Sequence, residues 1–175
     1  MNNTLRAFHG DAGLKERILQ QLETHKAADQ IIHGTYWENG KGCAIGCTVH
    51  SGDHTRYESQ LGIPVVLAYL EDQIFEGLPN AAAQEWPIQF IAAIRVGANL
   101  TSVWPQFAVW LLTDPHDGVI RFALDDSTRQ SIRRVADLYR VDCTDLVQWR
   151  AAAKAAWAAA KAAWAVANAA GVAEA

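Results

Sequence analysis

The chain has little of what marks a secreted, membrane or nucleic-acid-coating protein. Three cysteines among 175 residues is an odd and low number, which argues against a disulfide-stabilised secreted module. The formal net charge of −4 argues against a general nucleic-acid coat. The uncharged apolar runs are too short to span a bilayer, and the first residues lack the apolar stretch of a secretory signal. These absences predict a cytoplasmic protein without a membrane segment or a nucleic-acid partner.

What the chain does contain predicts helices. Hydrophobic residues make up 50% of it, which is enough apolar surface for a core. Apolar residues recur at three- and four-residue spacing in segments that begin near Asp11, Pro64, Pro87, Pro105 and Ser127. The stretch 119–124 is the single candidate strand. We therefore expect an all-α fold, a compact multi-helix domain followed by a long C-terminal helix.

The C-terminal segment has a composition of its own. Sixteen of the 25 residues in 151–175 are alanine, and the heptapeptide Ala-Ala-Ala-Lys-Ala-Ala-Trp occurs twice. Alanine is the strongest helix former, so we expect a helical domain over 1–143 and an Ala/Trp-rich helix over 144–175. Trp149, Trp157 and Trp164 fall on one face of that helix. They either pack on the preceding domain or pair with a second copy to form a homo-oligomer.

The segment 33–61 interrupts the helical pattern, because it is rich in glycine, cysteine, histidine and aromatic residues. Polar side chains without a regular apolar pattern are typical of segments that carry function. The centre of the segment reads Trp37-Glu-Asn-Gly-Lys-Gly-Cys43-Ala-Ile-Gly-Cys47. We therefore expect an active or binding site to lie here.

This motif resembles the Trp-Glu-x-Gly-Lys-Gly-Cys-Ala-Ile-Gly-Cys signature of a family of uncharacterised bacterial and bacteriophage proteins. The same family is also resembled by the Ala/Trp-rich tail and by four further stretches, Leu61–Pro64, Leu70–Asp72, Ile74–Pro79 and Trp110–Leu112. The resemblance covers roughly residues 5–113 and the tail. It implies a phage-related protein, and it implies no reaction because the family has no established activity.

One interpretation of the segment is a metal site. Cys43, Cys47, His50 and His54 are spaced four, three and four residues apart and are the ligand types of a tetrahedral zinc site, with iron as the other candidate metal. On one helix they would span about 16 Å, which is too far for a single ion. A shared site therefore needs a chain break near Ser51-Gly52. The alternative is that the small residues pack a tight helix.

A second interpretation makes Cys43 a catalytic nucleophile. Gly40-Lys41-Gly42 is typical of a turn that feeds a helix. Cys43 would then lie in the first helical turn, where the helix dipole and Lys41 lower a cysteine pKa. His54 or His25, brought close by the fold, would act as the base. Against this interpretation, a buried cysteine beside alanine and glycine is most often inert.

The other candidate ligand-binding residues are chosen by type and position. Trp37 would form a pocket wall, and Lys41 and Gly42 at a helix start would attract an anion. Glu71 lies one position past the apolar face of the helix that follows Pro64. It is either solvated or an inward carboxylate with a perturbed pKa.

The sequence thus supports two functions. The first is a small-ligand-binding or metal-binding helical domain with a Cys/His site, which leaves open whether the protein is an enzyme. The second is a non-enzymatic, phage-related interaction or assembly protein that acts through its C-terminal Ala/Trp helix.

Overall fold

The computed structural model describes residues 5–158, and its contacts divide the chain into two units, Met1–Thr101 and Ser102–Ala175. The all-α prediction is confirmed. Helices dominate the described residues, and the single sheet found there has two short strands. The contacts do not divide at residue 143, where the sequence had placed the boundary. Within 5–158, no helix combines the length and apolar character needed to cross a membrane.

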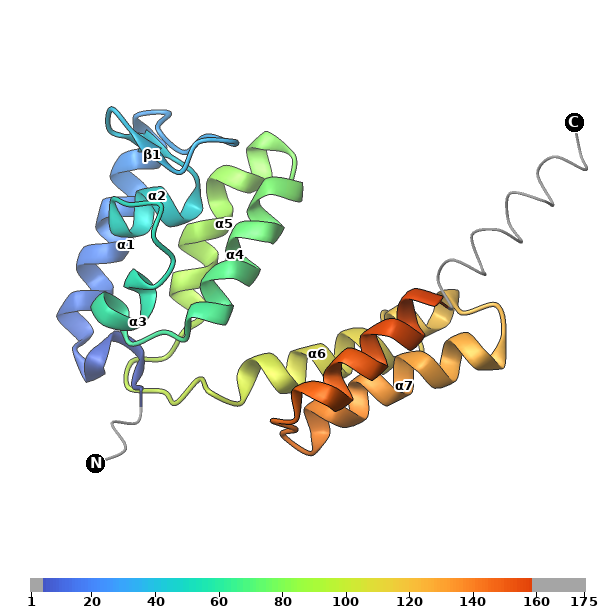
Figure 1. Ribbon diagram of the computed structural model, residues 1–175. Coiled ribbons are helices and arrows are strands. Elements are labelled where there is room, and N and C mark those ends of the chain that lie inside the picture. The colour runs from blue at the N-terminus through green and yellow to red at the C-terminus, as the bar shows by residue number, and fades with distance from the viewer. Residues whose placement is uncertain (1–4, 159–175) are drawn as a thin grey trace, which may run out of the picture. The chain divides into compact units, whose positions relative to one another are not determined.

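The first unit is a small helical domain (Figure 1). In chain order its elements are η1 (Ala7–Gly10), α1 (Ala12–Ala27), β1 (Trp37–Glu38), β2 (Lys41–Gly42), α2 (Ala44–Val49), α3 (Arg56–Leu61), α4 (Val65–Gly77) and α5 (Asn80–Ala93). α1 packs along α5, and α4 packs on α5 from the other side. The short helix α2 contacts α1, α4 and α5, so it lies at the centre of this unit and is buried along its whole length.

The predicted helix starts hold in part. The Asp11 carboxylate accepts a hydrogen bond from the Gly13 amide and caps α1, and Pro64 directly precedes α4, as expected. The third predicted start is wrong, because α5 begins at Asn80 and contains Pro87 in its interior. α1 ends at Ala27 rather than near residue 32, since Asp29 adopts a left-handed conformation with φ of 51°.

Two glycines allow the loop before β1 to lie directly on α2. A Cβ atom at Gly46 would lie 1.5 Å from the carbonyl oxygen of Tyr36, and one at Gly42 would lie 2.0 Å from the same oxygen. The Cys43 amide also donates to the carbonyl of Thr35 at 2.7 Å. Gly42 and Gly46 of the signature motif therefore serve backbone packing, which is the structural role that the sequence left open.

The second unit contains α6 (Val103–Thr113), η2 (Val119–Phe122), α7 (Asp126–Arg140) and a helix over 146–158 (Figure 1). The candidate strand at 119–124 is thus a 3-10 turn. Trp149 packs edge-on against Tyr139 of α7 at 4.7 Å between ring centroids, and its indole donates to the Cys143 carbonyl. Since the first turns of the helix over 146–158 pack on α7, they belong to this unit.

Candidate functional site

A buried polar cluster lies where α2, α3 and α4 meet. The Tyr57 hydroxyl, on α3, donates to Glu71 Oε2 on α4 at 2.5 Å, and both side chains are fully buried. The second carboxylate oxygen of Glu71 has no hydrogen-bond partner among the described residues. Burial raises the pKa of Glu71 from its ordinary value of 4.5 to about 8, so this carboxyl is mainly protonated at neutral pH.

The neighbouring residue Asp72 is the centre of the polar contacts. Its Oδ2 accepts a hydrogen bond from His54 Nε2 at 3.2 Å, and His54 in turn stacks on Tyr69 at 4.3 Å between ring centroids. The negative charge of Asp72 raises the pKa of Tyr36 and contributes to the raised pKa of the Cys43 thiol. Asp72 therefore lies beside three side chains, His54, Tyr36 and Cys43, that come from other parts of the first unit.

A pocket of about 230 Å³ opens beside Asp72. Its lining residues are Gly34, Thr35, Tyr36, Asp72, Gln73 and Glu76. Asp72 is 5% exposed, and its Oδ1 has no hydrogen-bond partner among the described residues. Glu76 accepts from the Gly34 amide at 3.2 Å, which joins the loop to α4. The pocket thus combines two carboxylates with one half-exposed phenol ring, and none of its described lining residues is a lysine or an arginine.

A second polar cluster lies near the ends of α1 and α2. His25 Nε2 faces His50 Nε2 at 2.9 Å, and His25 Nδ1 lies 2.7 Å from Gln30 Oε1. The indole of Trp37 stacks on His50 at 4.4 Å between centroids and meets His25 edge-on at 5.4 Å. Burial and the neighbouring His25 lower the pKa of His50, which favours its neutral form.

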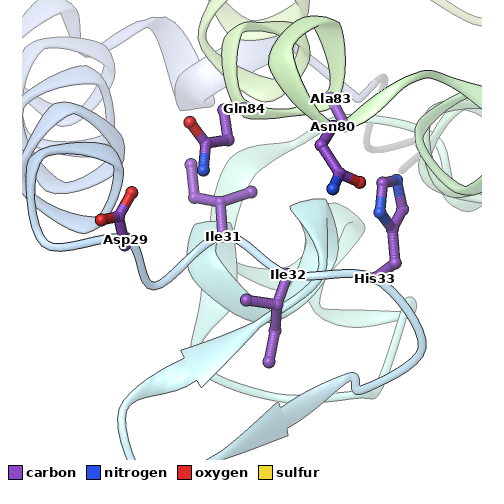
Figure 2. Close-up of a pocket in the computed structure, with 7 residues that line it drawn as sticks. All are labelled: Asp29, Ile31, Ile32, His33, Asn80, Ala83 and Gln84. Atoms are coloured by element: carbon purple, nitrogen blue, oxygen red, sulfur yellow. The ribbon is translucent and has the colours of Figure 1, made fainter.

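Figure 2 shows a second cavity, of about 440 Å³, between the segment 29–33 and the start of α5. Asn80 and His33 lie next to each other at one end of it, and Asp29 lies at the opposite end. The ring nitrogen Nε2 of His33 is used already, since it donates to the Phe75 carbonyl at 3.0 Å. Among the described residues, none of the side chains that line this cavity has a buried polar atom without a hydrogen-bond partner, whereas Asp72 at the other pocket does. The pocket at Asp72 is therefore the stronger candidate for a ligand site.

The predicted four-residue metal site is not formed. His50 faces His25, His54 bonds to Asp72, and the Cys47 thiol donates to the Gly42 carbonyl at 3.4 Å. Within residues 5–158, no group of three or more His, Cys, Asp or Glu side chains is arranged to hold a metal ion. The four residues do not share a helical face, because α2 covers only Ala44–Val49, with Cys43 before it and His50 after it in non-helical conformations.

The predicted lowering of the Cys43 pKa is also wrong. Cys43 is the residue before α2 rather than a member of its first turn, and it is 1% exposed. Burial raises the pKa of the thiol to about 12, which outweighs the backbone amides of Ile45 and Gly46 that lower it. The thiol is therefore protonated at neutral pH and poorly suited to act as a nucleophile.

The candidate site residues divide between the two clusters. Cys43 and His54 both lie beside Asp72, whereas His25, the other candidate base, lies with Trp37 and His50. The roles proposed for them in catalysis stay predictions. Glu71 is the inward carboxylate that the sequence offered as one alternative.

The other two candidates lie on the short sheet. Lys41 is exposed on β2, and the Gly42 carbonyl accepts from the Ile32 amide. Gly42 therefore joins the sheet to the end of the loop that follows α1, which is a structural role.

The sequence did not predict Asp72, Tyr36 or Glu76 as site residues, although Asp72 and Glu76 lie on the same helix as the candidate Glu71. Asp72 and Glu76 are four residues apart on one helix, a spacing that places them on the same face. That spacing indicates a pair of carboxylates on one side of the helix. No pattern in the chain indicates that the loop at Tyr36 would lie over this face.

The comparisons with known proteins add no relative. The chain matches no family model, and no curated protein or solved structure matches it.

Proposed function

We propose that the first unit is a small-ligand-binding domain whose site is the pocket at Asp72, and that it recognises a cationic nitrogen group such as an amine or a guanidinium. The observation that carries the proposal is the unpartnered Oδ1 of Asp72, buried at a pocket that is lined by a second carboxylate. A buried carboxylate oxygen without a hydrogen bond is costly, and a bound donor would remove that cost.

The rest of the pocket fits the same ligand class. Asp72 and Glu76 supply negative charge, and the ring of Tyr36, which is 53% exposed, offers a face for a cation. His54 donates to the other oxygen of Asp72, so it fixes the orientation of the carboxylate at the pocket. The arrangement favours binding rather than covalent catalysis, because burial keeps the nearby Cys43 thiol protonated.

The proposal is tested by titrating the ¹⁵N-labelled full chain with agmatine, putrescine and methylguanidine, with acetate as the anionic comparison. The amide resonances of Gly34, Tyr36 and Gln73 should shift with at least one cationic probe and stay in place with acetate. Asp72→Asn should weaken binding at least about tenfold, since a hydrogen bond to a charged group contributes about 1.5–3 kcal/mol.

The asparagine can still accept the bond from His54, so this variant retains the fold contact while losing the charge. Glu16→Gln, on the exposed side of α1, is the matched control and should bind as the wild type does. Absence of any shift with the cationic probes, or unchanged binding by Asp72→Asn, would rule out the site.

A second candidate function has an observation of its own. Trp157 is 76% exposed on the helix over 146–158, and Leu146 and Val147 of the same helix are also largely exposed. Trp149 is used within the unit, and Trp164 lies outside the described residues. We propose that Trp157 contributes to a homo-oligomer, in keeping with the assembly role that the sequence suggested.

Size-exclusion chromatography with light scattering tests this second function. The full chain should be larger than a monomer, and Trp157→Ala should shift it toward the monomer, while Trp86→Phe in the first unit should not. A monomeric wild-type chain would contradict it.

A cytoplasmic location and membership of the bacterial and phage family stay predictions. The three unpaired cysteines support the cytoplasmic location.

A further inference from the structure

We infer that His25 and His50 form a binding site for one divalent transition-metal ion, held between the two Nε2 atoms. The site shares no residue with the Asp72 pocket and is independent of the proposed function. It also differs from the four-residue metal site suggested by the sequence, because Cys43, Cys47 and His54 take no part in it.

The distance between the two nitrogens is close to what such an ion requires. The Nε2 atoms face each other at 2.9 Å. Two imidazoles on a tetrahedral zinc ion, at bond lengths of about 2.0 Å, have nitrogens about 3.3 Å apart. The rings now point their Nε2 atoms directly at each other, with centroids 5.2 Å apart. To form a two-ligand chelate, the nitrogens must therefore separate by a few tenths of an ångström and both rings must tilt so that their lone pairs meet at the ion, which are side-chain movements that leave α1 and α2 in place.

The contacts of His25 prepare its Nε2 as a ligand. Because the amide oxygen of Gln30 can only accept, the Nδ1 of His25 carries the proton and donates to it at 2.7 Å. The Nε2 of His25 is then unprotonated and presents its lone pair toward His50. A histidine whose other nitrogen donates to an oxygen is the usual arrangement of a metal ligand, since this bond sets the tautomer and the ring orientation.

The contacts of His50 hold its ring in place. The Trp37 indole stacks on it with an interplanar angle of 20°, and His25 packs edge-on against the same indole. His50 follows α2 in a left-handed conformation, with φ of 49° and ψ of 43°, and it is exposed whereas the residues of α2 are buried.

Binding requires one proton to move within His50. In the metal-free pair, His50 Nε2 donates its proton to the lone pair of His25 Nε2. When an ion binds, this proton leaves Nε2 and is replaced at Nδ1 by exchange with water, so both rings remain neutral and no net proton is released. Imidazole nitrogens favour Zn²⁺, Ni²⁺ and Cu²⁺, and water would complete the coordination of the two-ligand site.

The test uses the tag-free, metal-stripped full chain titrated with Zn²⁺ by calorimetry and with Cu²⁺ by electron paramagnetic resonance. We expect one ion per chain and a copper spectrum with hyperfine coupling from two imidazole nitrogens. His25→Gln and His50→Asn should each reduce the affinity for Zn²⁺ at least tenfold. Asparagine is chosen at position 50 because it tolerates the left-handed conformation.

His116→Gln, an exposed histidine of the second unit, is the matched control and should bind as the wild type does. A measurement on the wild-type chain guards against misfolded variants: Zn²⁺ should shift the Nε2 resonances of His25 and His50 in ¹⁵N spectra, while that of His33 stays in place. Equal affinity in the wild type and in folded His25→Gln, or zinc-induced shifts confined to other histidines, would overturn the inference.

Discussion

The buried pair of Tyr57 and Glu71 makes a direct prediction about stability and pH. Burial raises the pKa of Glu71 from 4.5 to about 8, so the folded state holds a proton that the unfolded chain releases at a lower pH. The contribution of protonated Glu71 to the free energy of unfolding is therefore fully present below pH 4.5 and is lost as the pH rises to 8. The pKa difference of about 3.5 corresponds to about 5 kcal/mol at 1.36 kcal/mol per unit.

Glu71→Gln removes this titration while keeping an oxygen that can accept from Tyr57. Urea unfolding at pH 5 and pH 8 measures this effect. Between these two pH values, the free energy of unfolding of the wild type should fall by several kcal/mol relative to that of the variant. The exposed control Glu16→Gln should follow the wild type. Parallel curves for the wild type and Glu71→Gln would refute the argument, because they would mean that Glu71 ionises in the folded state without cost.

The same pair gives a direct readout by carboxyl ¹³C NMR. The resonance that disappears in Glu71→Gln should titrate near pH 8 in the wild type. The hydrogen bond from Tyr57 lowers the pKa of Glu71, so Tyr57→Phe should move this titration to a still higher pH. A Glu71 resonance that titrates near pH 4.5 would show that the carboxyl is solvated.

Two further predictions concern the signature motif. In the folded protein, iodoacetamide should modify Cys143 and leave Cys43 and Cys47 unmodified, because burial raises the pKa of Cys43 and of Cys47 to about 12. Mass spectrometry of tryptic peptides measures this, and modified Cys43 or Cys47 would contradict the prediction. Gly46→Ala should destabilise the first unit by about 2–3 kcal/mol, since its Cβ would meet the Tyr36 carbonyl, whereas Gly77→Ala, with open space, should not; equal unfolding midpoints would contradict the packing argument.

Several features could be predicted from the sequence because they depend on local interactions. The helical class follows from apolar spacing, and the starts of α1 and α4 follow from Asp11 and Pro64, whose effects reach only the adjacent turn. The start of α5 was mispredicted because Pro87 was taken as the opening residue. A proline within a helix is tolerated when tertiary packing outweighs the lost hydrogen bond, and Pro87 is among the fully buried side chains.

The candidate site was located only in outline. The segment 33–61 does carry residues of both polar clusters, as its composition suggested, but their partners lie outside it. Asp72 comes from α4, and His25 comes from α1. Helical spacing groups residues of one segment, whereas contacts such as His54 with Asp72 span 18 residues and depend on how separate helices pack.

The sequence by itself determined the helical class, the polar segment 33–61 and its glycine-rich motif. Helix propensity, capping and the spacing of apolar residues act over only a few residues of the chain. Only the tertiary structure decided which side chains are removed from water. That decision reversed the expected chemistry of Cys43, whose burial outweighs the helix start, and it singled out Asp72 and Glu71 among the carboxylates. Desolvation depends on all the surrounding elements together, and no local pattern in the chain records it.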